Sequence, residues 1–216
     1  MEIKICCIQN FQEAQLAIMH GATALGLVAE MPSGPGVISE DTIRKIAKST
    51  PRNIDTFLLT SRRNTKNIIA QLKYCKTNTV QIVDSLKIGS YDDIRRSLPK
   101  VKIVQVIHVV DSSALLEAKE IAPKVDAILL DSGNPKKKVK ELGGTGRTHN
   151  WKISKELCSK INVPVYLAGG LNPENVEKAI RSVHPYGLDI CSGVRVNGNL
   201  DETKLKRYIK NIKNVL

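Results

Sequence analysis

Short apolar runs alternate with amphipathic stretches along the whole chain. The runs have the composition of strands, and each is followed by a stretch whose apolar positions recur at helical spacing. The runs are EIKICCI, ATALGLVA, IDTFLLT, TVQIVD, KIVQVIHV, VDAILLDS, VPVYLAG and GLDICSG. Strict alternation of strand and helix predicts a parallel sheet with helices outside it. Eight such units in 216 residues predict one α/β domain over residues 1–216, a (β/α)8 or TIM barrel, rather than an open doubly wound sheet.

Glycines gather where the last three predicted strands end. The sequence lacks G-x-G-x-x-G after its first strand, so the dinucleotide fingerprint is missing. In barrels the last two strand ends commonly hold a phosphate. The glycine-rich ends therefore predict a cradle of backbone N–H groups for a phosphorylated small molecule. Its candidate residues are Gly144, Thr145, Gly146, Gly169, Gly170, Ser192 and Gly193.

The first strand carries two adjacent thiols, and strand geometry separates their roles. Consecutive strand residues point to opposite faces, so Cys7 shares the apolar face of Ile3 and Ile5, whereas Cys6 shares the face of Lys4. We expect Cys6 to face the barrel interior near its C-terminal rim and Cys7 to pack against the helices. Cys191 is left undecided between packing and a role at the pocket.

Polar residues interrupt several predicted strands. For Lys4, Gln81 and Gln105 we expect an interior hydrogen-bonded network, because buried polar groups usually satisfy one another. Asp131 differs because it closes DAILLDS at the C-terminal end of its strand, where barrel enzymes carry out their chemistry. Asp131 is therefore a candidate catalytic carboxyl group.

Composition narrows the class of protein. The five cysteines include no C-x-x-C pair, and the four histidines show no metal-ligand spacing, so we expect a reduced cytoplasmic protein without a metal site. No run of about 18 apolar residues and no signal-peptide architecture is found, so no membrane partner is expected. The net charge of +12 lies partly on the last predicted helix, as a solvated basic face. With 4% aromatic residues and no recognition motif, nucleic acid is not the expected partner.

Five motifs, in order along the chain, are similar to those of a known family. They are KIC at 4–6, LLD at 129–131, GGTG at 143–146, LAGGLNPENV at 167–176 and DICSGV at 189–194. The sequence resembles phosphoribosylanthranilate isomerase, an enzyme of tryptophan biosynthesis. The resemblance implies a barrel that converts N-(5-phosphoribosyl)anthranilate to a 1-deoxyribulose 5-phosphate by an Amadori rearrangement, with no metal or cofactor.

The resemblance also implies roles for individual residues. The base of the family falls on Cys6 and its acid on Asp131. Phosphate contacts from the last two strand ends fall on four residues, Gly169, Gly170, Ser192 and Gly193. The protein is expected to be a monomer or a homodimer.

The sequence departs from the family pattern at four places. CC replaces CG at Cys7, and QIVD replaces QLHG at Val83 and Asp84. The loop EMPSGPGVIS lacks the arginine of the family's SPR, and GVR replaces GVE, which puts Arg195 where an acid is usual. We expect Arg195 or Arg147 to contact the anthranilate carboxylate instead.

Two alternative functions stay open. In one, the same barrel and acid–base pair act on a different phosphorylated sugar or sugar amine that lacks the carboxylate. In the other, the protein binds a phosphorylated ligand or a nucleic acid without catalysis. The loop with Lys136 to Lys138 is long for a strand-to-helix connection and is a candidate lid.

Overall fold

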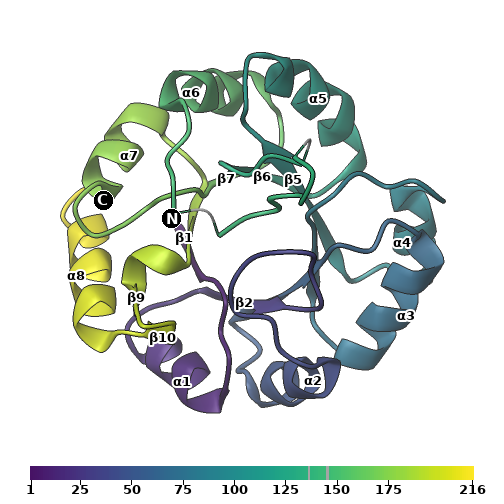
Figure 1. Cartoon of the computed structure of the whole chain (residues 1–216), viewed down its shortest axis with the longest axis horizontal. Coiled ribbons are helices and arrows are strands. Elements are labelled where there is room, and N and C mark those ends of the chain that lie inside the picture. Colours follow the sequence, from purple (N-terminus) through teal and green to yellow (C-terminus); the bar gives the residue numbers. More distant parts are fainter. Residues whose placement is uncertain (136, 145) are drawn as a thin grey trace.

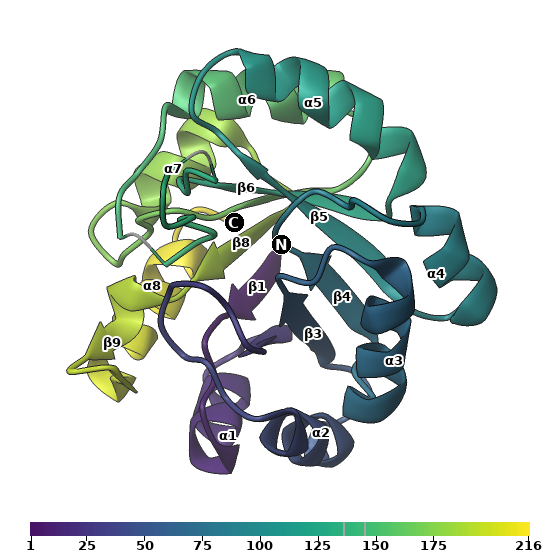
Figure 2. The same cartoon turned by 45° about the vertical axis from the view of Figure 1, so that its right-hand side comes forward.

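Eight parallel strands close into a barrel in the computed structural model, which describes residues 1–135, 137–144 and 146–216. Each strand pairs with the next along the chain, and the eighth pairs with the first. Figure 1 shows the helices as an outer ring around the strands, and Figure 2 shows the same arrangement turned by 45°. The predicted (β/α)8 architecture is confirmed.

The strands are β1 (Glu2–Ile5), β2 (Ala24–Val28), β3 (Asp55–Thr60), β4 (Thr79–Ile82), β5 (Lys102–His108), β6 (Ala127–Asp131), β7 (Val165–Leu167) and β8 (Gly187–Ile190). The helices are α1 (Phe11–Met19), α2 (Glu40–Ser49), α3 (Thr65–Cys75), α4 (Tyr91–Ser97), α5 (Ser113–Ile121), α6 (Trp151–Lys160), α7 (Val176–Val183) and α8 (Glu202–Lys213). Two short 3-10 helices, η1 (Ala122–Lys124) and η2 (Ser192–Val194), and a small hairpin of β9 (Arg195–Val196) and β10 (Asn199–Leu200) complete the described elements. No helix among the described residues is both long and apolar enough to cross a membrane.

Several helices begin at a polar residue whose side chain accepts a backbone hydrogen bond from the first turn. These N-caps are Asn10, Ser39, Asn64, Asn150 and Asp201. A side-chain oxygen at this position satisfies one of the N–H groups that a helix start leaves without a partner. The caps therefore fix where each helix begins after the loop that follows a strand.

The two faces of the barrel wall carry separate apolar clusters. In β2, Leu25 and Leu27 belong to the larger cluster between strands and helices, whereas Ala24 and Val28 belong to the smaller one inside the barrel. This alternation follows from the two-residue period of a strand. The interior is filled by side chains, as expected of a small barrel, so the pocket opens only at its rim.

A buried ion pair lies within this interior. The ammonium of Lys4 donates to a carboxylate oxygen of Asp189 at 2.7 Å, and its Nζ lies 5.2 Å from the ring centroid of Phe57. Burial alone would lower the pKa of Lys4, but Asp189 and the nearby thiols outweigh it and raise that pKa. The pair satisfies part of the predicted polar network. Gln105, in contrast, is directed to the helix layer and accepts from the hydroxyl of Tyr91 at 2.9 Å.

Removing one partner of this pair should strongly destabilise the barrel. Lys4→Met leaves the Asp189 carboxylate buried without a cation, which typically costs about 3–5 kcal/mol. The double variant Lys4→Met/Asp189→Leu removes both charges and should recover most of the loss. Lys102→Met breaks the exposed pair with Asp55 and should cost at most about 1 kcal/mol. Urea unfolding measures all three, and equal losses for the two single lysine variants would show that burial does not strengthen the Lys4–Asp189 pair.

Candidate active site

One pocket opens at the C-terminal rim of the barrel. It is lined by Cys6, Cys7, Val28, Met31, Ser33, Gly34, Pro35, Leu59, Gln81, Val83, Asp131, Leu142, Gly143, Gly144, Gly146, Ala168, Gly169, Gly170, Leu171, Asp189, Ile190, Cys191 and Ser192. Cys6 enters from the end of β1 and Asp131 from the end of β6. The structure thus brings the two predicted catalytic residues to one rim, with both side chains at the same pocket.

The Cys6 thiol lies between a second thiol and a buried ammonium. A hydrogen bond from the Cys7 thiol lowers the pKa of Cys6, and the charge of Lys4 adds to this effect against the opposing effect of burial. Because Gly26 on β2 has no side chain, it leaves space for the Cys6 thiol and the Lys4 ammonium. A side chain at Gly26 would begin 2.7 Å from the Sγ of Cys6 and 3.0 Å from the Nζ of Lys4. The pocket therefore favours the thiolate form of Cys6.

Cys7 does not lie where strand alternation put it. Strand β1 ends at Ile5, and Cys7 adopts a left-handed backbone with φ of 62°. This turn directs its side chain into the interior cluster and the pocket, where its Sγ lies 2.6 Å from the Sγ of Cys191. The prediction that Cys7 packs against the helices is wrong, because the two-residue period applies only within the strand.

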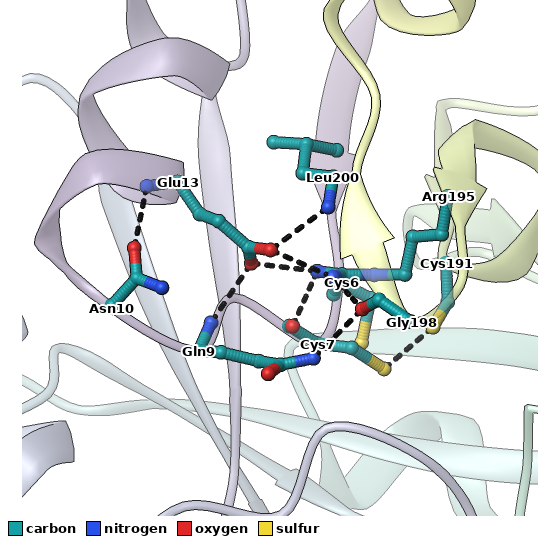
Figure 3. A network of polar contacts seen from close by, with 9 residues as sticks. All are labelled: Cys6, Cys7, Gln9, Asn10, Glu13, Cys191, Arg195, Gly198 and Leu200. Atoms are coloured by element: carbon teal, nitrogen blue, oxygen red, sulfur yellow. Dashed lines mark hydrogen bonds and ion pairs between the residues drawn. The ribbon is translucent and has the colours of Figure 1, made fainter.

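Arg195 forms hydrogen bonds with the backbone that directly follows β1 (Figure 3). Its guanidinium donates to both carboxylate oxygens of Glu13 at 2.9 Å and to the carbonyl oxygens of Cys6 and Cys7. The side chain is buried and lies outside the residues that line the pocket. This geometry does not fit the predicted contact of Arg195 with a substrate carboxylate, because the guanidinium is already committed to Glu13 and to backbone carbonyls.

Glu13 completes this buried arrangement. Its carboxylate also accepts the backbone N–H of Gln9 at 3.0 Å and that of Leu200 at 2.9 Å. Burial alone would raise the pKa of Glu13, but the hydrogen bonds from Arg195, Leu200 and Gln9 lower it. The pair therefore stays ionised and joins β1, α1 and the β9–β10 hairpin. The sequence reasoning missed Glu13, and its only signal was the unusual arginine at 195.

Asp131 faces the pocket in a different electrostatic environment. Burial raises the pKa of its carboxyl group, and the hydrogen bond from the Ser132 N–H and the nearby His108 only partly offset this. That N–H lies 2.7 Å from the carboxyl oxygen. The backbone of Gly143 passes so close that a side chain there would begin 2.8 Å from Asp131. The site therefore favours the protonated form of Asp131, the opposite of its effect on Cys6.

Most of the predicted glycine-rich cradle lines the pocket. Gly144, Gly146, Gly169, Gly170 and Ser192 are all at its wall. Gly169 and Gly170 have φ of 80° and 63°, a left-handed backbone that favours glycine.

The remaining two cradle candidates are placed differently. Gly193 is not among the lining residues and instead packs against the carbonyl oxygen of Leu171. Thr145 lies outside the described residues.

The loop between β6 and α6 covers one side of the pocket. Lys140 pairs with Asp84, and its carbonyl oxygen accepts from the Ser33 hydroxyl at 2.5 Å, which connects this loop to the ends of β4 and β2. Arg147 is exposed and pairs with Glu141 at 2.5 Å. Of the lysines predicted to form a lid, Lys136 lies outside the described residues, Lys137 pairs with Glu141 at 2.6 Å, and Lys138 is exposed.

Gln81 is buried in the interior, as predicted, but the sequence analysis did not place it at the pocket. It lines the pocket from β4, and its amide oxygen has no hydrogen-bond partner within the part of the chain that the structure describes. A buried polar atom without a partner is uncommon in native structures. Gln81 is therefore better placed to contact a ligand than to complete the predicted interior network.

Comparison with known proteins assigns the chain to a family. Residues 3–211 match the family model of N-(5'-phosphoribosyl)anthranilate isomerase. The chain belongs to the phosphoribosylanthranilate isomerase family. It is 33% identical to N-(5'-phosphoribosyl)anthranilate isomerase 2 of Methanosarcina mazei, over 99% of this chain and 95% of that one. The corresponding enzyme of Methanosarcina acetivorans is 31% identical, over 98% and 92%.

Solved structures of the same family share the fold. The phosphoribosylanthranilate isomerase of Thermotoga maritima superposes with a TM-score of 0.81 at 28% identity, covering 99% of both chains. A second structure, a complex with reduced 1-(o-carboxyphenylamino)-1-deoxyribulose 5-phosphate, superposes with a TM-score of 0.78 at 26% identity, again covering 99% of both chains.

Two departures from the isomerase pattern are physically coupled in this structure. Cys7 replaces the glycine of KICG and keeps a left-handed backbone that glycine adopts at little cost. Gly36 lies in the loop that lacks the family's arginine. A side chain at Gly36 would collide with the Cβ of Cys7 and begin 2.9 Å from its Cα. The thiol of Cys7 therefore requires that position 36 carry no side chain.

This coupling predicts a non-additive pair of substitutions. Gly36→Ala should destabilise the protein by about 1–3 kcal/mol through the collision with Cys7, and by about 1 kcal/mol more because its φ of 76° disfavours alanine. In a Cys7→Gly background the collision with the Cβ of Cys7 disappears and only the milder one with its Cα is left beside the backbone cost, so the loss should be smaller. Gly21→Ala is the control for backbone strain alone, since its φ is 106° and its nearest neighbour would be 3.8 Å away. A urea-unfolding cycle tests the coupling, and additive losses would contradict it.

Proposed function

We propose that the protein catalyses the Amadori rearrangement of N-(5'-phosphoribosyl)anthranilate, a step of tryptophan biosynthesis. Family membership supports the substrate and the reaction. The observation that carries the mechanism is the pairing of Cys6 and Asp131 at one pocket, with environments that shift their pKa values in opposite directions. Such divergent environments are how enzymes assign acid and base roles at neutral pH. The reactive pair also argues against a purely binding protein.

Asp131 acts as the general acid. Its carboxyl group holds a proton because burial disfavours the charged form. It gives this proton to the ring oxygen of the ribose, so that the ring opens and the amine nitrogen forms a Schiff base with C1. Gly143 lies directly beside the carboxyl group, which helps to keep the acid away from bulk water.

Cys6 acts as the general base. Its thiolate takes the proton from C2 of the open-chain sugar, and the resulting enol amine rearranges to the ketose product. The hydrogen bond from Cys7 and the ammonium of Lys4 stabilise the thiolate before the proton arrives. Because the base is at the end of β1 and the acid at the end of β6, the two groups approach the sugar from different sides of the pocket.

The phosphate group is held by backbone N–H groups of the glycine-rich cradle. Gly169, Gly170 and Ser192 supply it from the ends of β7 and β8. A side chain at Gly170 would begin 2.5 Å from backbone atoms of Arg147 and Thr148, so only glycine lets the loop that follows β6 close over this end. The net charge of +12 adds a favourable field for a phosphorylated substrate.

The anthranilate carboxylate has no evident partner in the pocket. Neither lysine nor arginine occurs among the lining residues within the described part of the chain. Arg195 already pairs with Glu13, and Cys7 leaves no space for a longer side chain at Gly36. Arg147, on the loop that covers the pocket, is the remaining candidate for the contact. This observation also favours a second candidate function, the same rearrangement on a phosphorylated sugar amine without the carboxylate.

The compartment follows from the thiols. All five cysteines are unpaired, and three of them line the pocket. Free thiols of this kind persist in a reducing compartment. We therefore place the enzyme in the cytoplasm.

Steady-state kinetics on N-(5'-phosphoribosyl)anthranilate test this function. The wild type should reach a kcat/KM of about 10⁴–10⁸ M⁻¹s⁻¹. Cys6→Ser and Asp131→Asn should each lower kcat by about 10²–10⁴-fold, because each removes a proton-transfer group. Cys75→Ser, a change outside the pocket, should leave kcat unaltered. Wild-type efficiency below about 10² M⁻¹s⁻¹ would favour the substrate without a carboxylate.

Asp131→Asn should also change the pH dependence of stability. An acid whose pKa is raised in the folded state binds more protons there than when unfolded, so stability falls as pH rises from about 4 through the raised pKa. At pH 7 the variant should therefore unfold at higher urea than the wild type, and the gap should close toward about pH 3. Asp93→Asn should do the reverse, because the Ser90 N–H lowers the pKa of Asp93. A gap that does not vary with pH would contradict the assignment.

A further inference from the structure

The proposed mechanism takes Cys6 as the base, and the other two thiols at the pocket, Cys7 and Cys191, are in contact with each other. The Sγ atoms of Cys7 and Cys191 are 2.6 Å apart although the residues are 184 positions apart in the sequence. Cys7 follows the end of β1 and Cys191 follows the end of β8, and these two strands are paired neighbours in the barrel. Figure 3 shows the contact between the two sulfur atoms, near the Arg195–Glu13 pair.

We propose that Cys7 and Cys191 are an oxidation site, at which peroxide forms a reversible disulfide that lowers turnover. The two sulfur atoms are already 2.6 Å apart, and a disulfide joins its sulfur atoms at about 2.05 Å. The bond therefore forms with little movement of the backbone. Cys191 is partly exposed, so peroxide reaches it from the pocket, whereas Cys7 is buried beside it.

The alternative pairings are geometrically worse. Cys6 and Cys7 are adjacent, and consecutive Cα atoms of a trans peptide are only about 3.8 Å apart, below the range that a disulfide needs. The Sγ of Cys6 points toward Gly26 on β2, the strand on the other side of β1 from β8. The geometry therefore directs oxidation to Cys7 and Cys191 and leaves Cys6 reduced.

The reaction consumes one hydrogen peroxide for each bond. The Cys191 sulfur attacks one peroxide oxygen, the O–O bond breaks, and a sulfenic acid forms while the first water leaves. The Cys7 sulfur then attacks the sulfenic sulfur, the S–S bond forms, the S–O bond breaks, and the second water leaves. Each sulfur is oxidised by one electron, the peroxide gains two, and both thiol protons end in water.

Oxidation affects the base of the proposed mechanism. Cys6 and Cys7 line the same pocket, and the neighbouring Cys7 thiol lowers the pKa of Cys6, which favours the thiolate form. A disulfide sulfur has no proton to donate, so this stabilisation is lost. The effect on turnover rests on the proposed function, whereas the formation of the bond does not.

The first measurement is the covalent state of the protein. The full-length protein is reduced, freed of reductant, treated with hydrogen peroxide and alkylated before mass analysis. We expect one disulfide per chain that joins the peptides of Cys7 and Cys191 and that dithiothreitol opens again. Cys7→Ser and Cys191→Ser should form no disulfide. Cys158→Ser removes a similarly exposed thiol on α6 and should behave like the wild type.

The second measurement is turnover of N-(5'-phosphoribosyl)anthranilate before and after the same treatment. Oxidation should lower kcat/KM by about 10- to 100-fold, the effect of losing one hydrogen bond to a charged group. Dithiothreitol should restore it. Oxidised Cys191→Ser should keep its own starting value.

Three results would overturn the proposal. One is a disulfide between any other pair of cysteines. Another is oxidation of Cys6 while Cys7 and Cys191 stay open to alkylation. The third is an unchanged kcat/KM in protein that carries the Cys7–Cys191 bond, which would remove the effect on turnover. If the reduced protein shows no turnover at all, the proposed function fails instead, and the mass analysis still decides whether the oxidation site exists.

Discussion

The buried pair of Arg195 and Glu13 fixes the position of the candidate base. Beyond Ile5 the backbone leaves strand geometry, so the carbonyl groups of Cys6 and Cys7 need partners other than a neighbouring strand. Buried carbonyls almost always find hydrogen bonds, and here a single guanidinium supplies them. That cation is stable in the interior only because Glu13 neutralises it. The hairpin of β9 and β10 belongs to the same unit, since Gly198 and Leu200 complete the hydrogen bonds of the pair.

A second buried pair sets the charge on the other side of Cys6. Lys4 and Asp189 are matched in position on β1 and β8, and the ammonium lies close to the thiol. Asp131 has no lysine or arginine among its described hydrogen-bond partners, and burial decides its protonation. The same barrel interior therefore lowers the pKa of the Cys6 thiol and raises the pKa of the Asp131 carboxyl group. The difference comes from where the strands place cations, and not from any special property of the two side chains.

The sequence predicted those parts of the site that depend on strand order and strand ends. The alternation of apolar runs with amphipathic stretches located eight strands, and the place of Asp131 at the end of its run put it at a rim. Cys7 was misplaced because a left-handed residue breaks the alternation and leaves no trace in hydrophobicity. Arg195 was predicted to contact the substrate carboxylate because its actual partner, Glu13, is 182 residues away in the sequence. Gln105 was expected to face the barrel interior, but it faces the helix layer, where it contacts Tyr91. Its residue type does not decide between these two faces of a buried strand.

The departures at Cys7 and Gly36 bear on how this enzyme recognises its substrate. A residue larger than glycine in the left-handed turn after β1 occupies the space into which a side chain at position 36 would extend. A side chain at position 36 would meet the Cβ of Cys7 first and its Cα next, so the loop after β2 has no room for a cation at that position while residue 7 is cysteine. Arg195 is committed to Glu13 and to the backbone, whereas Arg147 lies beside the glycine cradle on the loop after β6. That loop also contacts Ser33 and Asp84, which joins it to the ends of β2 and β4.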